Sequence, residues 1–254
     1  SRPAQGYDTK LVGKWHLGAR HVNHFPHNRG FDHFYGHTAQ GIDYYTHLNR
    51  GALDWQRNGV SVREEGYSTH LLTNEAVRLI EGRDPDRPFF LYVAYNAAHS
   101  PFQVPDRYLA RYGDVEDPNE QIYCGMVEAM DEGVGQILDA IDEAGLRENT
   151  IVVYVNDNGG LRLSNNGELR GGKTSMYEGG LHTAGLINWK RHFTPGSRLD
   201  QQVTVLDWLP TLVDALDVDW TPSNPLDGQN MWPAMTEGEV VNREDTVIAF
   251  RGER

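Results

Sequence analysis

The chain has 254 residues, of which 39% are hydrophobic, so it can bury the core of one large α/β domain or two small ones. Its 36 acidic and 23 basic residues give a formal net charge of −13, which argues against nucleic acid or an anionic membrane as a general partner. No run of about 18 apolar residues is present to span a membrane, and the single cysteine, Cys124, excludes an internal disulfide.

Helix and strand patterns alternate along the chain. Apolar residues at helical spacing predict helices, and short apolar runs that end in polar, glycine-containing turns predict buried strands. The helices are predicted over residues 67–82, 119–146 and 204–216, and the strands over residues 87–101, 149–160 and 181–189. Alternation of this kind predicts a largely parallel sheet.

Polar side chains follow two of the predicted strands. His99 follows the first strand, and Asp157 and Asn158 follow the second. Open α/β folds bind ligands in the crevice at the carboxyl ends of their strands, so we expect these residues along a functional edge.

Residues 167–174 match the phosphate-loop pattern GxxxxGK[ST], with Lys173 in the lysine position. A phosphate loop needs a buried strand directly before the glycines and a helix directly after them. The preceding residues are too polar for a core strand, and Gly179 and Gly180 interrupt any helix that follows. Nucleotide binding is therefore disfavoured, and a solvated loop lysine is the simplest alternative.

Four segments combine polar residues with glycine or aromatic residues: GYDTKLVGKWHLG (6–18), HSPFQVP (99–105), VNDNGG (155–160) and GGKTSMYEGG (171–180). Together they offer two lysines, two histidines, an aspartate and an asparagine, a set that could bind a tetrahedral anion beside a hard cation. Carboxylate and amide oxygens suit Ca²⁺ or Mg²⁺, whereas Zn²⁺ prefers more histidine or cysteine.

In their order and separation these segments resemble the sulfatase family of the alkaline phosphatase superfamily, most closely its arylsulfatase B-like (N-acetylgalactosamine-4-sulfatase-like) branch. The similarity extends to RGFDHFYGHTAQGIDYYTH, MDEGVGQILDAI and DWLPTLVD, and so covers nearly the whole chain. The resemblance implies an alkaline phosphatase-like α/β fold with a largely parallel central sheet and helices on both faces. Residues 1–254 would form one catalytic domain, truncated at both ends.

The resemblance also implies roles for individual residues. Lys14 and Lys173 would hold sulfate oxygens, His16 would act beside the nucleophile, and His99 would donate a proton to the leaving group.

Asp157 and Asn158 would form half of a Ca²⁺ site, with Mg²⁺ as the alternative metal. The family's nucleophile is a hydrated formylglycine made from a Cys/Ser-x-Pro-x-Arg motif. That motif is absent from these residues, as are the paired aspartates that complete the calcium site. We expect both in upstream sequence, and the chain as given to be inactive. His182 stands where the family usually has arginine, and the family's smaller C-terminal subdomain is also missing.

The function that these features imply is sulfuric ester hydrolysis by the full-length parent, on a sulfated sugar or polysaccharide. The alternatives are a phosphate or phosphonate ester hydrolase of the same superfamily, or a non-catalytic binder of sulfated glycans. The family resemblance places the protein in the periplasm or outside the cell, or in the lysosome if its source is eukaryotic.

Several other residues could have either a functional or a purely structural role. Cys124 is interpreted as a structural cysteine, Trp15 as a packing residue, and the histidines of HVNHFPH (21–27) as loop or cleft-rim residues rather than metal ligands. For Asp43, Tyr44, Tyr45 and His47, sugar contact and ordinary loop packing remain equal alternatives, and Arg170 either supports an anion site or pairs with an acidic neighbour.

Overall fold

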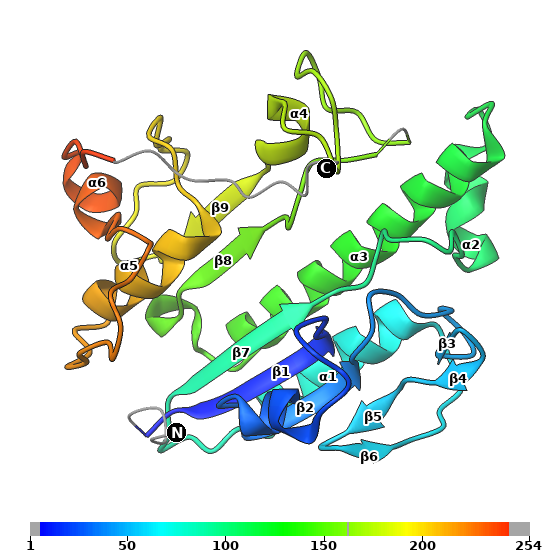
Figure 1. The fold of residues 1–254 in the computed structure, drawn as a ribbon, viewed down its shortest axis with the longest axis horizontal. Helices are drawn as coiled ribbons and strands as arrows, with labels where there is room; N and C mark the ends of the chain where they lie inside the picture. The colour runs from blue at the N-terminus through cyan, green and yellow to red at the C-terminus, as the bar shows by residue number, and fades with distance from the viewer. Residues whose placement is uncertain (1–5, 162, 244–254) are drawn as a thin grey trace, which may run out of the picture. The chain divides into compact units, whose positions relative to one another are not determined.

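A computed structural model describes residues 6–161 and 163–243 (Figure 1). Backbone contacts divide the chain into two compact units. Unit 1 comprises residues 1–146 and 161–165, and unit 2 comprises residues 147–160 and 166–254. Each unit is described by itself.

Unit 1 is built on a five-stranded mixed sheet with the order β6-β5-β2-β1-β7. Its strands are β1 (Asp8–Lys14), β2 (His33–His37), β5 (Gln56–Arg57), β6 (Val60–Ser61) and β7 (Phe89–Ala94). The central strand β1 pairs in parallel with both β2 and β7. Its five inner residues are all buried, as expected for a parallel strand covered on both faces.

The sheet departs from the predicted parallel arrangement at one edge, where β2–β5 and β5–β6 pair antiparallel. Asn58 and Gly59 join β5 to β6, and both have positive φ. This is the two-residue turn that favours antiparallel hairpins. A second small hairpin pairs β3 (Leu48–Asn49) with β4 (Ala52–Leu53), and its turn residues Arg50 and Gly51 likewise have positive φ.

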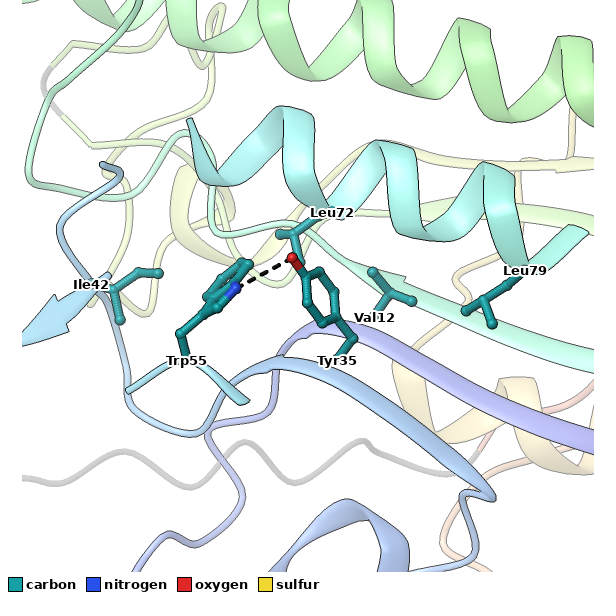
Figure 2. Packing of buried hydrophobic residues seen from close by; sticks show 6 residues of the cluster. All are labelled: Val12, Tyr35, Ile42, Trp55, Leu72 and Leu79. Atoms are coloured by element: carbon teal, nitrogen blue, oxygen red, sulfur yellow. Dashed lines mark hydrogen bonds between the residues drawn. The ribbon is translucent and has the colours of Figure 1, made fainter. Parts of the chain in front are cut away.

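The helices of unit 1 are α1 (Ser68–Glu81), α2 (Asp106–Leu109) and α3 (Pro118–Glu143), and its short 3₁₀ helices are η1 (Val22–His24), η2 (Pro26–Asn28) and η3 (Ala110–Tyr112). Helix α1 packs against β1, β2 and β7. Figure 2 shows side chains of α1 pointing toward those of β1 and β2, with Trp55 Nε1 3.3 Å from the Tyr35 hydroxyl. The core cluster comprises Val12, Tyr35, Ile42, Trp55, Leu72 and Leu79.

Helix α3 confirms the long helix predicted over residues 119–146, and it packs against α1 and α2. Asp117 caps its first turn, and Pro118 occupies the first helical position. A second core cluster lies between α2, α3 and the segment that follows β7, and it consists of Tyr44, Tyr67, Val104, Tyr108, Met126 and Ala129.

Unit 2 contains an antiparallel pair of strands, β8 (Val152–Val155) and β9 (Gly185–Asn188). Its helical segments are η4 (Arg147–Asn149), α4 (Glu178–Leu181), η5 (Val205–Asp207), α5 (Trp208–Ala215) and α6 (Trp232–Glu237). The strands predicted over 149–160 and 181–189 and the helix over 204–216 are confirmed in type, although each is shorter than its apolar pattern. The prediction that these strands are buried is wrong, because every residue of β8 and β9 is half-buried or exposed. Across the described parts of both units, no helix has the length and apolar character needed to cross a bilayer.

A buried histidine lies in the core of unit 1 beside the end of β1. His37, the last residue of β2, has no exposed surface, and its ring stacks on Trp55 with 6.4 Å between centroids. His47 stacks on Trp55 as well, at 4.5 Å. The pKa of His37 is lowered to about 4, chiefly by burial. The Asp54 carboxylate opposes this shift, and the charges of Lys14 and His16 add to it. His37 is therefore neutral in the folded protein at neutral pH.

A glycine determines how closely α3 approaches α1. A Cβ atom on Gly133 would lie 2.3 Å from Thr73 Oγ1, whereas one on Gly135 would meet nothing within 4 Å. The Thr73 hydroxyl cannot easily move, because it hydrogen-bonds to Thr69 O at 2.9 Å and to the Tyr95 hydroxyl at 2.7 Å.

We therefore expect Gly133→Ala to lower the free energy of unfolding by about 1–3 kcal/mol through overpacking. Gly135→Ala is the matched control on the same helix, and it should raise that free energy by up to about 1 kcal/mol through helix propensity. Urea unfolding of the two variants measures both effects. Equal shifts in the two variants would contradict the close approach of α3 to Thr73.

The depressed pKa of His37 predicts a loss of stability in mild acid. The unfolded state takes up a proton near pH 6.5 and the folded state only near pH 4, so stability falls as pH falls through this window. The expected loss attributable to His37 is about 2 kcal/mol between pH 7 and pH 5.

Urea unfolding at the two pH values should show this loss in the wild type and a smaller one in His37→Asn. His47 and His70 also have pKa values lowered by burial, so some loss should persist in the variant. An identical pH dependence of the two proteins would refute the assignment to His37.

Candidate functional site

The end of β1 presents two of the predicted site residues, Lys14 and His16. Lys14 is the last residue of the strand and is paired in register with His37 of β2. The loop that follows is fixed by backbone bonds, from Trp15 N to His37 O at 2.9 Å and from His16 N to Thr38 O at 3.2 Å. His16 adopts a positive φ of 50° and its side chain is exposed.

Trp15 holds this loop in place. Its indole Nε1 donates to His24 O at 2.8 Å, and its ring packs edge-on against Phe31 with 6.2 Å between centroids. These contacts fit the packing role predicted for Trp15. The first contact also joins the loop to η1, which contains His24.

His99 lies beyond the carboxyl end of β7, the strand parallel to β1. Its Nδ1 is 2.7 Å from Ser100 O, and because a carbonyl only accepts, Nδ1 carries the proton. Nε2 is then the atom able to give or take a proton. The Tyr44 hydroxyl lies 2.8 Å from both Asn96 O and His99 O, which anchors the loop.

A depression of about 450 Å³ lies beside His99, and all of its lining belongs to unit 1. Residues 40–43, 48–50 and 99–101 form its walls. Hydrogen-bonding groups from Gln40, Asp43 and Asn49 stand among apolar ones, a mixture suited to a small polar ligand.

The structure separates the residues of GIDYYTH for which the sequence left two alternatives. Tyr44 and His47 are buried in the core, whereas Tyr45 is exposed and Asp43 lines the depression. Burial alone would raise the pKa of Asp43, but hydrogen bonds from Thr46, Gln103 and Tyr45 outweigh it and hold the pKa at about 2. Of this segment, Asp43 is thus the carboxylate placed to contact a ligand in the depression.

Unit 2 brings Asp157 and Asn158 close to the Lys173 loop. Glycines allow this, because a Cβ atom on Gly159 would lie 1.8 Å from Gly179 O. Lys173 N donates to Gly160 O at 3.1 Å.

Asn166 links the same two loops through its side chain. Its Oδ1 accepts from Gly160 N at 3.0 Å, and its Nδ2 donates to Gly160 O and Gly171 O, each at 3.1 Å.

The surroundings of Lys173 exclude a phosphate loop. Residues 163–177 contain neither strand nor helix, and the helix that follows, α4, has only four residues. The glycines here permit close contacts between backbones.

Asp157 and Asn158 fit a hard cation by their chemistry. Asp157 is exposed and has no ion pair within the described residues, and Asn158 Nδ2 donates to Gly159 O at 3.1 Å, which leaves Oδ1 to accept or to coordinate. Two oxygen ligands are fewer than the six to eight that Ca²⁺ takes. Residues 6–161 and 163–243 contain no cluster of three or more His, Cys, Asp or Glu residues suited to a metal.

The contacts or burial of three further residues indicate structural roles. The Arg170 guanidinium lies over the Tyr177 ring, 3.7 Å from its centroid. His182 Nδ1 lies 3.5 Å from Glu178 Oε2 at the surface. Cys124 is half-buried on α3, and burial raises the pKa of its thiol, as suits a structural cysteine.

The predicted site residues thus form two groups. Lys14, His16 and His99 follow parallel strands of unit 1, whereas Asp157, Asn158 and Lys173 lie on joined loops of unit 2. Sequence reasoning missed His37 and the lining residues Gln40, Asn49 and Arg50. For Arg50, the adjacent Gly51 was the available signal of a tight turn.

Comparisons with known proteins identify the family to which the chain belongs. The family model described as Sulfatase matches residues 3–218. Arylsulfatase J of Mus musculus is 34% identical over 250 residues, which cover 92% of this chain and 41% of that protein. N-acetylgalactosamine-6-sulfatase of Homo sapiens is 28% identical over 271 residues, which cover 98% of this chain and 49% of that protein.

A similar solved structure is that of Ps i-CgsB in complex with k-i-k-neocarrahexaose. It is 34% identical, with a TM-score of 0.86 over 92% of this chain and 56% of that chain. The chain therefore spans about half the length of the relatives it matches. This likeness confirms the alkaline phosphatase-like fold predicted from the sequence, and the chain belongs to the sulfatase family.

Proposed function

We propose that the full-length protein containing this chain hydrolyses sulfate esters of a sulfated sugar or polysaccharide. The observation that carries this proposal is His99 on the wall of a depression lined by groups that suit a sugar. Its volume of about 450 Å³ falls in the range of small-molecule sites. Membership of the sulfatase family and similarity to an N-acetylgalactosamine-6-sulfatase support the same substrate class.

Within this proposal, Lys14 and Lys173 bind sulfate oxygens and offset the negative charge that builds during transfer. His16 acts beside the nucleophile. It takes up the proton of the second hydroxyl of the hydrated formylglycine when sulfate is released. His99 Nε2 gives a proton to the departing sugar oxygen as the sulfur–oxygen bond breaks. A hydrated formylglycine, expected outside this chain, supplies the attacking hydroxyl.

Asp157 and Asn158 supply two oxygen ligands to Ca²⁺, with Mg²⁺ as the alternative. When bound, the ion would supply positive charge that offsets the charge of the ester sulfate. The rest of its ligands are expected from the paired aspartates outside this chain. By family analogy we place the protein in the periplasm or outside the cell, or in the lysosome if its source is eukaryotic.

Two rivals differ by observable features. A phosphate or phosphonate ester hydrolase would carry a bare threonine or serine in place of the Cys/Ser-x-Pro-x-Arg motif. A non-catalytic glycan binder has no need to keep Lys14, His16, His99 and Lys173. Sequencing upstream of residue 1 separates sulfatase from phosphatase, since lack of both the motif and an aspartate pair removes the sulfatase mechanism.

The proposed acid role of His99 predicts a dependence on the leaving group. His99→Ala should reduce hydrolysis of a saccharide sulfate by at least ~10²-fold, because a sugar alkoxide leaves poorly without a proton. The loss should be smaller for 4-nitrophenyl sulfate, whose phenolate leaves unprotonated. Comparison of kcat/KM for the two substrates measures this difference.

Lys173→Ala is expected to lower both rates by at least ~10²-fold, because sulfate binding does not depend on the leaving group. Lys190→Ala, an exposed lysine of the same unit, is the control and should retain wild-type rates. If His99→Ala lowered kcat/KM for both substrates by the same factor, His99 would not be the acid.

The calcium assignment predicts that Asp157→Ala weakens Ca²⁺ binding by at least ~10-fold, because a carboxylate ligand is lost. Calcium titration of the chelator-stripped full-length protein by calorimetry measures the dissociation constant without any need for activity. Asp200→Ala, an exposed aspartate of the same unit, is the control. Equal dissociation constants in the two variants would remove Asp157 from the metal site.

A further inference from the structure

The depression beside His99 also has an arginine in its lining. Arg50 occupies the turn of the β3–β4 hairpin, and it lines the depression together with Asn49 and His99. Nothing in the proposed chemistry of sulfate transfer uses this arginine. Its conformation and its charge both point to a ligand.

Arg50 has a conformation that is unfavourable for a residue with a side chain. Its φ of 49°, followed by 85° at Gly51, places both turn residues in the left-handed region. Such a conformation is strained at a non-glycine residue, and glycine, asparagine or aspartate would fit with less strain. Strained residues of this kind concentrate at ligand sites.

The hairpin is also fastened to the floor of the depression. Asn49 Nδ2 donates to Gly41 O at 2.6 Å, and Asp43 N donates to Leu48 O at 2.9 Å. Arg50 therefore projects from a fixed support, which limits the ordering that a ligand must impose.

The charge of Arg50 is not neutralised within the described part of the chain. Its exposed side chain forms no ion pair or hydrogen bond with residues 6–161 or 163–243. Asp43, the carboxylate on the same lining, keeps its charge but accepts its hydrogen bonds from other groups: its Oδ1 accepts from Tyr45 N and Thr46 N, and its Oδ2 accepts from Gln103 Nε2. Among the residues that line the depression, Arg50 is the one with a permanent positive charge.

We propose that Arg50 binds a second anionic group of the substrate, a sulfate or carboxylate on the saccharide whose ester is cleaved beside His99. This inference rests on the proposed function and narrows its substrate class to sugars that bear at least two negative groups. The planar guanidinium can donate two parallel hydrogen bonds to such a group. Gln40 and Asn49, on the same lining, can hydrogen-bond to ring hydroxyls.

The test compares three disaccharides: one with a single sulfate, one with two sulfates, and one with a sulfate and a carboxylate. Their affinities are measured by calorimetry on the full-length protein in a His99→Ala background, which slows turnover. We expect Arg50→Ala to weaken binding of the two dianionic sugars by about tenfold and to abolish the preference for them over the monosulfated sugar. Arg50→Lys should restore part of that preference, since the charge remains without the fork.

Arg63→Ala, an exposed arginine outside the depression, is the matched control and should keep the wild-type preference. If Arg50→Ala loses the preference for only one of the two dianionic sugars, that sugar identifies the anion that Arg50 binds. An unchanged preference in Arg50→Ala, or no preference in the parent protein, would overturn the proposal. Because the readout is binding, an Arg50-dependent preference in a protein with no sulfatase activity would reject the proposed function and retain the anion site.

Discussion

The position of the site residues in unit 1 depends on how closely three strands approach one another at their carboxyl ends. A Cβ atom on Gly13 would lie 2.0 Å from Ala94 O, and one on Gly36 would lie 2.2 Å from Gly13 O. Both glycines also have positive φ. A side chain at either position would therefore collide with backbone atoms and would also strain its own backbone. The residues directly after them, Lys14 and His37, are placed by this contact.

The loops of unit 2 also approach one another closely at glycines. Gly159 packs against the backbone of Gly179, and a Cβ atom on Gly172 would lie 2.3 Å from Gly160 O. Of the two glycines of the GxxxxGK pattern, Gly172 thus faces another backbone segment, whereas Gly167 adopts a positive φ of 61° and a Cβ atom there would meet nothing within 4 Å. In a phosphate loop, the glycines would instead leave their N–H groups pointing at a bound phosphate. One local sequence pattern can serve either purpose, and the flanking elements distinguish them.

Periodicity in the sequence was sufficient to predict the long elements. Helices α1 and α3 and strand β7 have apolar patterns long enough to be distinctive, and they appear where expected. The hairpins β3–β4 and β5–β6 escaped prediction because strands of two residues carry no period, although Asn58-Gly59 was a usable turn signal. Their antiparallel pairing is what makes the sheet mixed.

Only part of the candidate site could be predicted from the sequence. Lys14, His99 and Asp157 were identified by resemblance to a family, and the structure places each at or after the end of a strand. His37 could not be recognised in the same way, because a neutral histidine buried against a tryptophan leaves no mark in the sequence. Arg50 also required coordinates, since its significance lies in its φ angle and in the depression that it lines.

The net charge of −13 seems at first to oppose a polyanionic substrate. At physiological ionic strength, however, exposed charges interact weakly beyond a Debye length of about 8 Å. Binding of an anionic sugar is then governed by the few charges close to it, and on the lining of the depression these are the Arg50 guanidinium, which attracts it, and the Asp43 carboxylate, which repels it. Salt below the physiological level would lengthen the reach of the overall negative charge and strengthen the Arg50 contact at the same time, so the two effects oppose each other. The salt dependence of binding, compared between a dianionic and a monoanionic sugar, therefore separates the local attraction from the overall repulsion.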